Sequence, residues 1–264
     1  MIKKPYAIVL MYHQIVPNGK SENWIPSSLA DKNYGVTLKN FKNQLKAISE
    51  NGFQVKSLSS WIKSFSSVSR SHTNLPTIII TFDDGYSTDF DLAVPELERL
   101  KFPSTFFISS EKIDSPGMMT FNMINKISKN PLFCLGSHGA THRFLTSLNE
   151  YECRNELLKS LSMIRDINLA AGRPPFYPID LSAPGGRTNS AVRKIAFQLG
   201  FRSQFTSAPG ILKYGEDLFS IPRLPVMSSY TVDAFIKLLN PHSFPFHLNG
   251  WVRRGRQILR NVKY

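Results

Sequence analysis

Apolar residues along the chain alternate between short continuous runs and longer stretches with helical spacing. Residues 6–11, 75–82 and 133–136 form short, nearly unbroken apolar runs, which are typical of strands that are buried on both faces. Residues 36–50 and 91–101 instead carry apolar side chains three and four positions apart, which predicts amphipathic helices. Strands that alternate with helices predict a parallel α/β fold, either a barrel or a doubly wound sheet.

Residues with capping and turn preferences mark the ends of these elements. Thr37 is positioned to cap the first predicted helix, and Asn51 with Gly52 ends it. Ser147 and Glu150 have the spacing of a capping box, which predicts a helix from there to about residue 168. The remaining pattern predicts helices at 58–65, 188–199, 230–239 and 250–262, and strands at 53–55, 104–109, 201–206 and 218–226.

Composition places the chain among globular proteins. Of 264 residues, 42% are apolar and 19% are charged, which excludes a disordered or collagen-like chain. No apolar run is long enough to span a bilayer and no secretory cleavage site follows the start, so we expect a cytoplasmic protein. Cys134 and Cys153 are too few for a disulfide scaffold or a cysteine zinc site. Without repeats or a linker, residues 1–240 should form one domain and residues 241–264 a C-terminal tail.

Two adjacent carboxylates follow the strongest predicted strand. The run at 75–82 ends directly in Asp83, Asp84 and Gly85, and catalytic groups of parallel α/β folds gather at the carboxyl ends of strands. Neighbouring side chains of an extended chain point in different directions, so one carboxylate could bind a metal ion while the other faces substrate. A polar turn capped by aspartate is the alternative interpretation of the same residues.

Two histidines follow another predicted strand. His138 and His142 are four residues apart, which puts them on one face if the segment turns helically and is a metal-binding spacing. Two unrelated loop histidines would give the same pattern. Taken with the aspartates, two histidines and one carboxylate leave positions open on a zinc-like ion, as in hydrolytic sites. The spare carboxylate could then deprotonate a metal-bound water.

These motifs resemble those of a known family. TFDDG at 81–85 and SHGATH at 137–142 resemble the motifs of the polysaccharide deacetylases, also called NodB-homology domains or family 4 carbohydrate esterases. The resemblance covers residues 6–226, and LMYHQI at 10–15 is similar to the branch that includes biofilm poly-N-acetylglucosamine deacetylases. It implies a distorted (β/α) barrel and a metal-dependent hydrolase that removes N-acetyl groups from amino sugars. The alternative is a catalytically inactive carbohydrate-binding or assembly protein that retains the barrel.

The resemblance also implies roles for individual residues. Asp83 corresponds to the general base of the family, and Asp84, His138 and His142 correspond to the ligands of one divalent metal ion. Zinc is the expected ion, and nickel, cobalt or manganese would suit the same ligands. Gly185 stands at the position whose backbone N–H holds the oxyanion.

The sequence departs from the family pattern in two respects. Ser182 stands where the family has an arginine that orients the base, and Arg187 or Arg223 is a candidate replacement. The late Leu-His motif that supplies the general acid is also missing, so His13, at the end of the first predicted strand, is the expected substitute. A hydrogen-bonded structural histidine is the alternative for His13. The expected substrate contacts are Tyr12, Pro184, Arg187 and Arg223.

The net charge is +13, and much of it lies near the C-terminus. Residues 250–264 place apolar side chains on one helical face and basic ones on the rest, namely Arg253, Arg254, Arg256, Arg260 and Lys263. This pattern predicts a helix on the inner, anionic membrane surface, or a terminal helix packed on the barrel. A membrane-bound deacetylase or deformylase could reach lipid-linked sugars of lipopolysaccharide or exopolysaccharide assembly. Binding to nucleic acid would rest on charge alone, and no recognised motif supports it.

Overall fold

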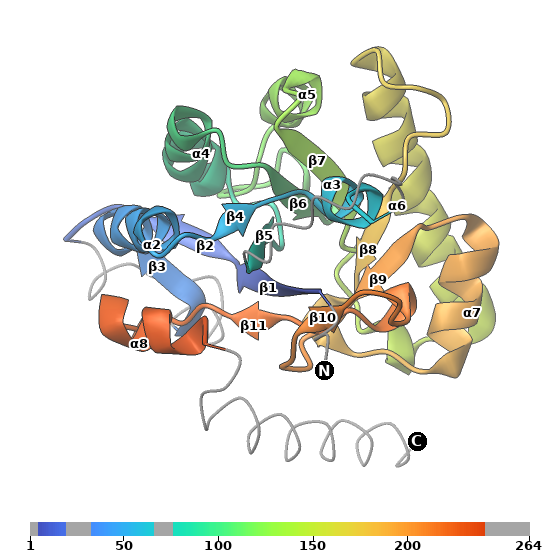
Figure 1. Cartoon of the computed structure of the whole chain (residues 1–264). Coiled ribbons are helices and arrows are strands. Elements are labelled where there is room, and N and C mark those ends of the chain that lie inside the picture. Colours follow the sequence, from blue (N-terminus) through green and yellow to red (C-terminus); the bar gives the residue numbers. More distant parts are fainter. Residues whose placement is uncertain (1–4, 20–32, 66–75, 241–264) are drawn as a thin grey trace.

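The centre of the molecule is a strongly curved sheet (Figure 1). The computed structural model describes residues 5–19, 33–65 and 76–240. The parallel strands of the sheet follow one another in the order β1 (Tyr6–Tyr12), β5 (Thr77–Phe82), β6 (Ser104–Ile108), β7 (Phe133–Ser137), β8 (Asp180–Ser182) and β9 (Ser203–Phe205). Two shorter strands extend this sheet, because β10 (Leu212–Lys213) pairs with β1 and β4 (Gln54–Val55) pairs with β5. The strands β2 (Gln14–Val16) and β3 (Gly35–Thr37) pair with each other in a separate sheet.

A short segment after β9 ties the two ends of the sheet together. Ile221 forms a parallel bridge with Phe205 of β9, and β11 (Leu224–Pro225) pairs in parallel with β1. The sheet thereby curls into the expected barrel-like form. The predicted strand at 218–226 is wrong in its first part, where a 3₁₀ turn, Leu218–Ser220, precedes the two-residue strand. Pro222 and Pro225 lack the N–H that a regular strand would donate.

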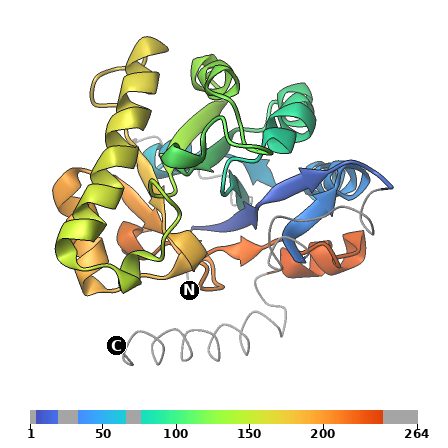
Figure 2. The same ribbon diagram turned by 180° about the vertical axis from the view of Figure 1, so that it is seen from behind.

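Most helices cover the outside of the curved sheet, as the front and back views show (Figures 1 and 2). A π-helical turn, Asp89–Ala93, leads directly into α4. Further 3₁₀ turns are Ser110–Lys112, Leu145–Ser147 and Pro184–Gly186. The α-helices are α2 (Leu38–Glu50), α3 (Leu58–Lys63), α4 (Val94–Leu100), α5 (Phe121–Lys129), α6 (Glu150–Ala170), α7 (Ser190–Leu199) and α8 (Val232–Leu238). The exception is α3, whose Leu58 and Trp61 pack against inward-facing strand residues such as Ile79.

Capping chemistry explains where the helices begin. Thr37 accepts a hydrogen bond from the Asn40 N–H at the start of α2, as predicted. The predicted capping box is two residues early, because Asn149 and Glu152 form the reciprocal pair at the start of α6. Ser147 belongs instead to the preceding 3₁₀ turn.

Alternate positions of each central strand enter two different cores. Phe82 of β5 faces outward and packs with Phe41 of α2, in the cluster between sheet and helices. Ile79 of the same strand faces inward and packs with Phe107 and Phe205 in the second cluster. This two-residue period decides which side chains after the strand can enter the barrel.

The predicted tail, residues 241–264, lies outside the described residues. Within the described ranges, no helix combines the length and the apolar character needed to cross a membrane.

Candidate active site

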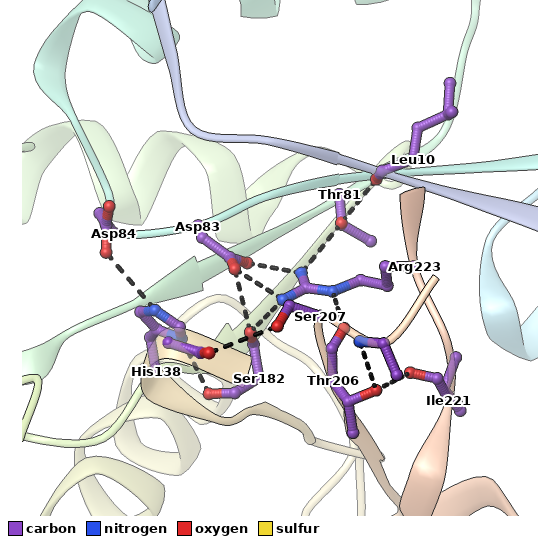
Figure 3. Close-up of polar contacts among 12 residues, drawn as sticks. Leu10, Thr81, Asp83, Asp84, His138, Ser182, Thr206, Ser207, Ile221 and Arg223 are labelled. Carbon is purple, nitrogen blue, oxygen red and sulfur yellow. Dashed lines mark hydrogen bonds and ion pairs between the residues drawn. The ribbon is translucent and has the colours of Figure 1, made fainter. Parts of the chain in front are cut away.

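Asp83 continues the inward-facing side of β5. Ile79 packs in the inner cluster, and Thr81 and Asp83 follow it at two-residue intervals. Their polar side chains meet Arg223 inside the curve of the sheet (Figure 3). The strand therefore delivers a carboxylate to the carboxyl end of the barrel, where the sequence placed it.

Arg223 holds Asp83 with both arms of its guanidinium. Nη1 donates to Asp83 Oδ1 and Nη2 to Oδ2, each at 2.7 Å, and Ser182 Oγ donates to Oδ2 at 3.1 Å. The guanidinium also donates to Thr206 O at 2.9 Å, Ser182 Oγ at 2.8 Å and Thr81 Oγ1 at 3.2 Å (Figure 3). The carboxylate therefore has one fixed orientation.

The position of Arg223 corrects one expectation and selects between two others. Arg223 is 0% exposed, so it cannot contact substrate as predicted. It comes from the segment that closes the sheet and lies over the rings of Phe107 and Phe205. Of the two candidates for the missing family arginine, Arg223 therefore contacts Asp83, whereas Arg187 lies elsewhere.

The charge state of Asp83 follows from competing effects. Burial on its own raises the pKa of the Asp83 carboxyl, but the Arg223 charge, the charge of His138 and the hydrogen bonds from Arg223 hold this pKa below its ordinary value. Asp83 is therefore an ionised carboxylate near neutral pH.

Asp84 turns away from Asp83 because the strand ends between them. Asp84 has φ +74° and Gly85 φ +86°, in the left-handed region that suits glycine and strains aspartate. The turn aims the Asp84 carboxylate at the loop after β7, where its Oδ1 lies 3.0 Å from His142 Nε2 and 3.4 Å from His138 Nε2. The two adjacent carboxylates thus face different partners, as expected.

His138 and His142 meet in a loop and not on a helix. The segment after β7 is irregular, and His142 itself has φ +69°. The expectation of a shared helical face is therefore wrong, although the two rings still lie 4.9 Å apart between centroids. Strained backbone at both Asp84 and His142 is typical of functional sites.

Glu156 supports this loop from α6, and the sequence analysis missed it. Its Oε1 accepts hydrogen bonds from Thr141 N at 2.6 Å and Thr141 Oγ1 at 2.9 Å. The side chain is buried, and Thr141 lies next to His142. The available signal was an acidic residue on the apolar side of a predicted helix, between Cys153 and Leu157.

The three converging side chains fit a divalent metal ion. One ligand atom each from Asp84, His138 and His142 lies within 4.8 Å of the others. His138 Nδ1 donates to the Ser182 carbonyl at 2.8 Å, so Nε2 is the ring nitrogen left to bind an ion. Asp84 Oδ1 lies beside Nε2 of both histidines but makes no regular hydrogen bond to a described residue. A divalent cation could be held between these atoms, and this ligand set suits zinc.

Comparison with known proteins places this site in a family. Residues 70–203 match the family described as Polysaccharide deacetylase. The chain belongs to the polysaccharide deacetylase family. The matched range contains both aspartates and both histidines, whereas Arg223 and His13 lie outside it.

Individual relatives also agree with this assignment, and their alignments extend beyond residues 70–203. The chain is 26% identical over 253 residues to the poly-beta-1,6-N-acetyl-D-glucosamine N-deacetylase of Staphylococcus epidermidis, which covers 90% of this chain and 83% of that protein. The structure of Streptococcus pyogenes deacetylase PplD in complex with acetate has a TM-score of 0.75 at 19% identity, covering 90% of this chain and 100% of that chain. A polysaccharide deacetylase from Bacillus cereus has a TM-score of 0.73 at 24% identity, covering 90% and 70%. The solved structures confirm the expected fold.

Gly185, the expected oxyanion donor, lies in the 3₁₀ turn after β8. Gly185 has φ +63° and is exposed, and its N–H has no hydrogen-bond partner among the described residues. A Cβ atom placed on Gly185 would lie 2.6 Å from Phe144 Cε1, so Phe144 fills the space of the missing side chain. Pro184 is buried, which corrects its expected contact with substrate. Arg187 is exposed and stacks on Phe144.

The two residues at the end of β1 have different surroundings. Tyr12 is fully buried between Phe41 and Phe82, and its hydroxyl donates to Gln44 Oε1 at 3.0 Å. The expectation that Tyr12 binds substrate is therefore wrong, because Tyr12 continues the outward face of the strand.

His13 lies within electrostatic range of the candidate site. Its ring stacks on Tyr34 with 4.3 Å between centroids, and its buried Nδ1 has no hydrogen-bond partner among the described residues. Burial lowers the pKa of His13, while the charges of Asp83 and Asp84 oppose that shift. The alternative for His13 is a structural histidine held by hydrogen bonds. Among the described residues, no hydrogen bond to Nδ1 supports that alternative.

Proposed function

We propose that this member of the polysaccharide deacetylase family is a metal-dependent hydrolase that removes an N-acetyl or N-formyl group from an amino sugar. The observation that carries this proposal is the side-by-side arrangement of two units. One is Asp83, fixed by Arg223, and the other is the Asp84, His138 and His142 cluster. The first suits proton transfer and the second suits a divalent ion.

Asp84, His138 and His142 would hold the ion, with zinc expected and nickel, cobalt or manganese as alternatives. When bound, such an ion would supply Lewis-acid chemistry, polarising the amide carbonyl and lowering the pKa of a water molecule. The hydrogen bond from His138 Nδ1 to the Ser182 carbonyl fixes the ring so that Nε2 faces the ion.

The other residues handle protons and charge. Asp83 takes the proton of the attacking water, and Arg223 keeps the carboxylate ionised and oriented. The free N–H of Gly185 donates to the oxygen that becomes negative as the water adds to the amide carbon. His13 in its protonated form, which burial disfavours and the Asp83 and Asp84 charges favour, delivers a proton to the leaving nitrogen. The C–N bond breaks, and acetate or formate and a free amino sugar result.

We further propose that the substrate is a lipid-linked or cell-surface glycan precursor at the inner face of the membrane. The basic, amphipathic pattern of residues 250–264 supports this placement. In this arrangement residues 1–240 supply the catalytic domain and residues 241–264 hold it near the anionic surface.

The test combines metal analysis with acetate release. After dialysis against zinc, we expect about one tightly bound ion per wild-type chain and none in His142→Ala. Arg143→Ala is the matched control, because Arg143 is the next residue of the same loop and pairs only with Glu152 in the described part of the chain. It should retain the ion.

Turnover is measured on the same proteins. Wild type should release acetate from N-acetylated sugars, lose this activity with a chelator and regain it with zinc. His142→Ala should remain inactive after zinc is added. A wild-type protein that holds the ion but releases neither acetate nor formate from lipid-linked and free substrates would favour a catalytically inactive binding protein. Absence of a bound ion would contradict the mechanism.

A further inference from the structure

An exposed aromatic ring and an arginine form a ledge beside the candidate active site. The Arg187 guanidinium carbon lies 4.1 Å from the centroid of the Phe144 ring. Phe144 is 40% exposed, and Arg187 is exposed as well. We call these two side chains the Phe144–Arg187 ledge. Other rings, such as Phe121 and Phe197, are more exposed than Phe144, so exposure does not distinguish this ring. The stacked arginine and the place of the pair beside the candidate site do.

The ledge adjoins both parts of the candidate site. Phe144 follows His142 by two residues, and Arg187 follows Gly185 by two residues. The Phe144 ring lies against Gly185 so closely that a Cβ atom there would be 2.6 Å from it. A sugar whose amide group reached the Gly185 N–H would therefore extend its neighbouring groups toward the ledge.

The Arg187 guanidinium has no polar partner among the described residues, and its contact is the stacking on Phe144. By contrast, Arg99, Arg143 and Arg193 each pair with an acidic side chain. The exposed Arg165 also lacks a carboxylate partner, but it donates a hydrogen bond to the Leu199 carbonyl. Stacking on Phe144 holds the guanidinium plane and leaves the N–H edges free. A fixed, unpaired fork of donors is suited to two oxygens of one anion.

We propose that the Phe144–Arg187 ledge binds an oxyanionic group, a phosphate or a carboxylate, carried by the glycan next to its acetamido group. This inference rests on the proposed function for the position of the sugar, and it names the substrate class more closely. Neutral glycans would lose the contact with Arg187, so the site would prefer anionic amino-sugar precursors.

The experiment compares three substrates that share one acetamido sugar. N-acetylglucosamine 1-phosphate tests the phosphate, N-acetylmuramic acid tests the carboxylate, and the methyl glycoside of N-acetylglucosamine is neutral. Acetate release by the zinc-loaded full chain gives kcat/KM for each, in wild type, Arg187→Ala, Arg187→Lys and Phe144→Ala. Arg99→Ala is the control, because it removes an exposed arginine on α4.

We expect wild type to prefer one or both anionic substrates about tenfold or more, as charged hydrogen bonds allow. Arg187→Ala should abolish this preference by lowering kcat/KM for the preferred anionic substrate to about the level of the methyl glycoside, and Arg99→Ala should keep the wild-type preference. Arg187→Lys should restore part of it, because lysine keeps the charge without the planar fork. If wild type prefers only one of the two anionic substrates, that result identifies whether the bound group is a phosphate or a carboxylate. Equal kcat/KM for all three wild-type substrates would overturn the ledge and leave the hydrolase intact.

Calorimetric binding separates the two proposals if no acetate is released. The same three ligands are titrated into metal-free wild type and Arg187→Ala, so that no anion can bind through zinc. If wild type binds an anionic ligand more tightly than the neutral one and Arg187→Ala does not, the ledge is supported even though the proposed hydrolase function is not. Binding that does not distinguish the three ligands, or no binding, would overturn the ledge.

Discussion

Arg223 and Asp83 are charged side chains that the fold removes from water together. Arg223 is 0% exposed and Asp83 is 2% exposed, with two hydrogen bonds of 2.7 Å between them. Desolvating either charge costs several kcal/mol, and only a well-oriented partner offsets this cost. Removing one partner therefore leaves a buried, uncompensated charge.

We predict that Arg223→Met lowers the free energy of unfolding by about 3–5 kcal/mol near pH 7. The loss should shrink in acid. In wild type Arg223 helps to hold the Asp83 pKa below its ordinary value, so the pair stabilises the protein above the unfolded-state pKa and this contribution disappears as pH falls through the native pKa. Without Arg223, burial raises the Asp83 pKa, so the variant can protonate the carboxyl in mild acid and relieve the buried charge.

Urea unfolding at about pH 7 and about pH 4.5 tests this prediction, with Arg99→Met as the control. Arg99 forms an exposed pair with Glu96, so its loss should cost about 0.5 kcal/mol or less at either pH. A destabilisation of Arg223→Met that did not change between the two pH values would show that packing and not charge is responsible.

Local patterns could predict some of these residues and not others. Asp83, Asp84, His138 and His142 stand directly after apolar strands, so their position at one edge of the sheet follows from the chain itself. The partnership of Arg223 with Asp83 spans 140 residues and depends on how the sheet closes, which no local pattern records.

At the scale of elements, α6 braces the loop that carries the histidines. Thr141 donates both its N–H and its hydroxyl to Glu156 Oε1, and Ser137 Oγ lies 2.8 Å from Ser160 Oγ on the same helix. These contacts hold a loop whose His142 has a left-handed backbone. The helix therefore positions the loop that carries two of the metal-ligand candidates, although it provides no ligand itself.

We predict that Glu156→Ala weakens zinc binding by about 10- to 100-fold, as outer partners of metal ligands commonly do. Competition with a chelator measures the affinity, and thermal unfolding measures stability. Glu152→Ala is the matched control, because it removes the capping box of the same helix at a cost of about 1 kcal/mol. It should destabilise the protein without changing zinc affinity. Equal zinc affinity in wild type and Glu156→Ala would assign Glu156 a purely structural role.

Element types followed from the sequence more reliably than their ends or their faces. The strand at β5 and the helix at α2 have strong periodicity and local caps, and both form where predicted. Tyr12 is an expected substrate contact, but strand alternation turns it outward into the core. α5 was not predicted, although Thr120 caps it, because its apolar pattern is short.

At the scale of the whole molecule, closure of the sheet completes one half of the candidate site. The segment from Ile221 to Pro225 joins β9 to β1 and inserts Arg223 beside Asp83. The Asp84 and His138 contact joins only the ends of β5 and β7. The Asp83–Arg223 pair therefore requires the two ends of the sheet to meet, and the candidate metal site does not.

The net charge of +13 also acts on the molecule as a whole, and it leads to the last prediction. Any anionic surface attracts a protein of this charge, with about 1 kcal/mol for each basic residue near the surface. If residues 250–264 form the membrane contact, the basic residues there should matter more than an equal number elsewhere. The apolar face of the same segment would add a contribution that salt does not screen.

We predict that the full chain sediments with vesicles of phosphatidylglycerol and not with vesicles of phosphatidylcholine. Replacing Arg253, Arg254, Arg256, Arg260 and Lys263 with glutamine should weaken this binding by more than about 100-fold. The control carries five glutamines at exposed lysines of the barrel, Lys39, Lys46, Lys101, Lys129 and Lys213, and has the same net charge. It should retain most of the binding. Equal losses in the two variants would mean that total charge, and not the C-terminal segment, determines attraction to the membrane.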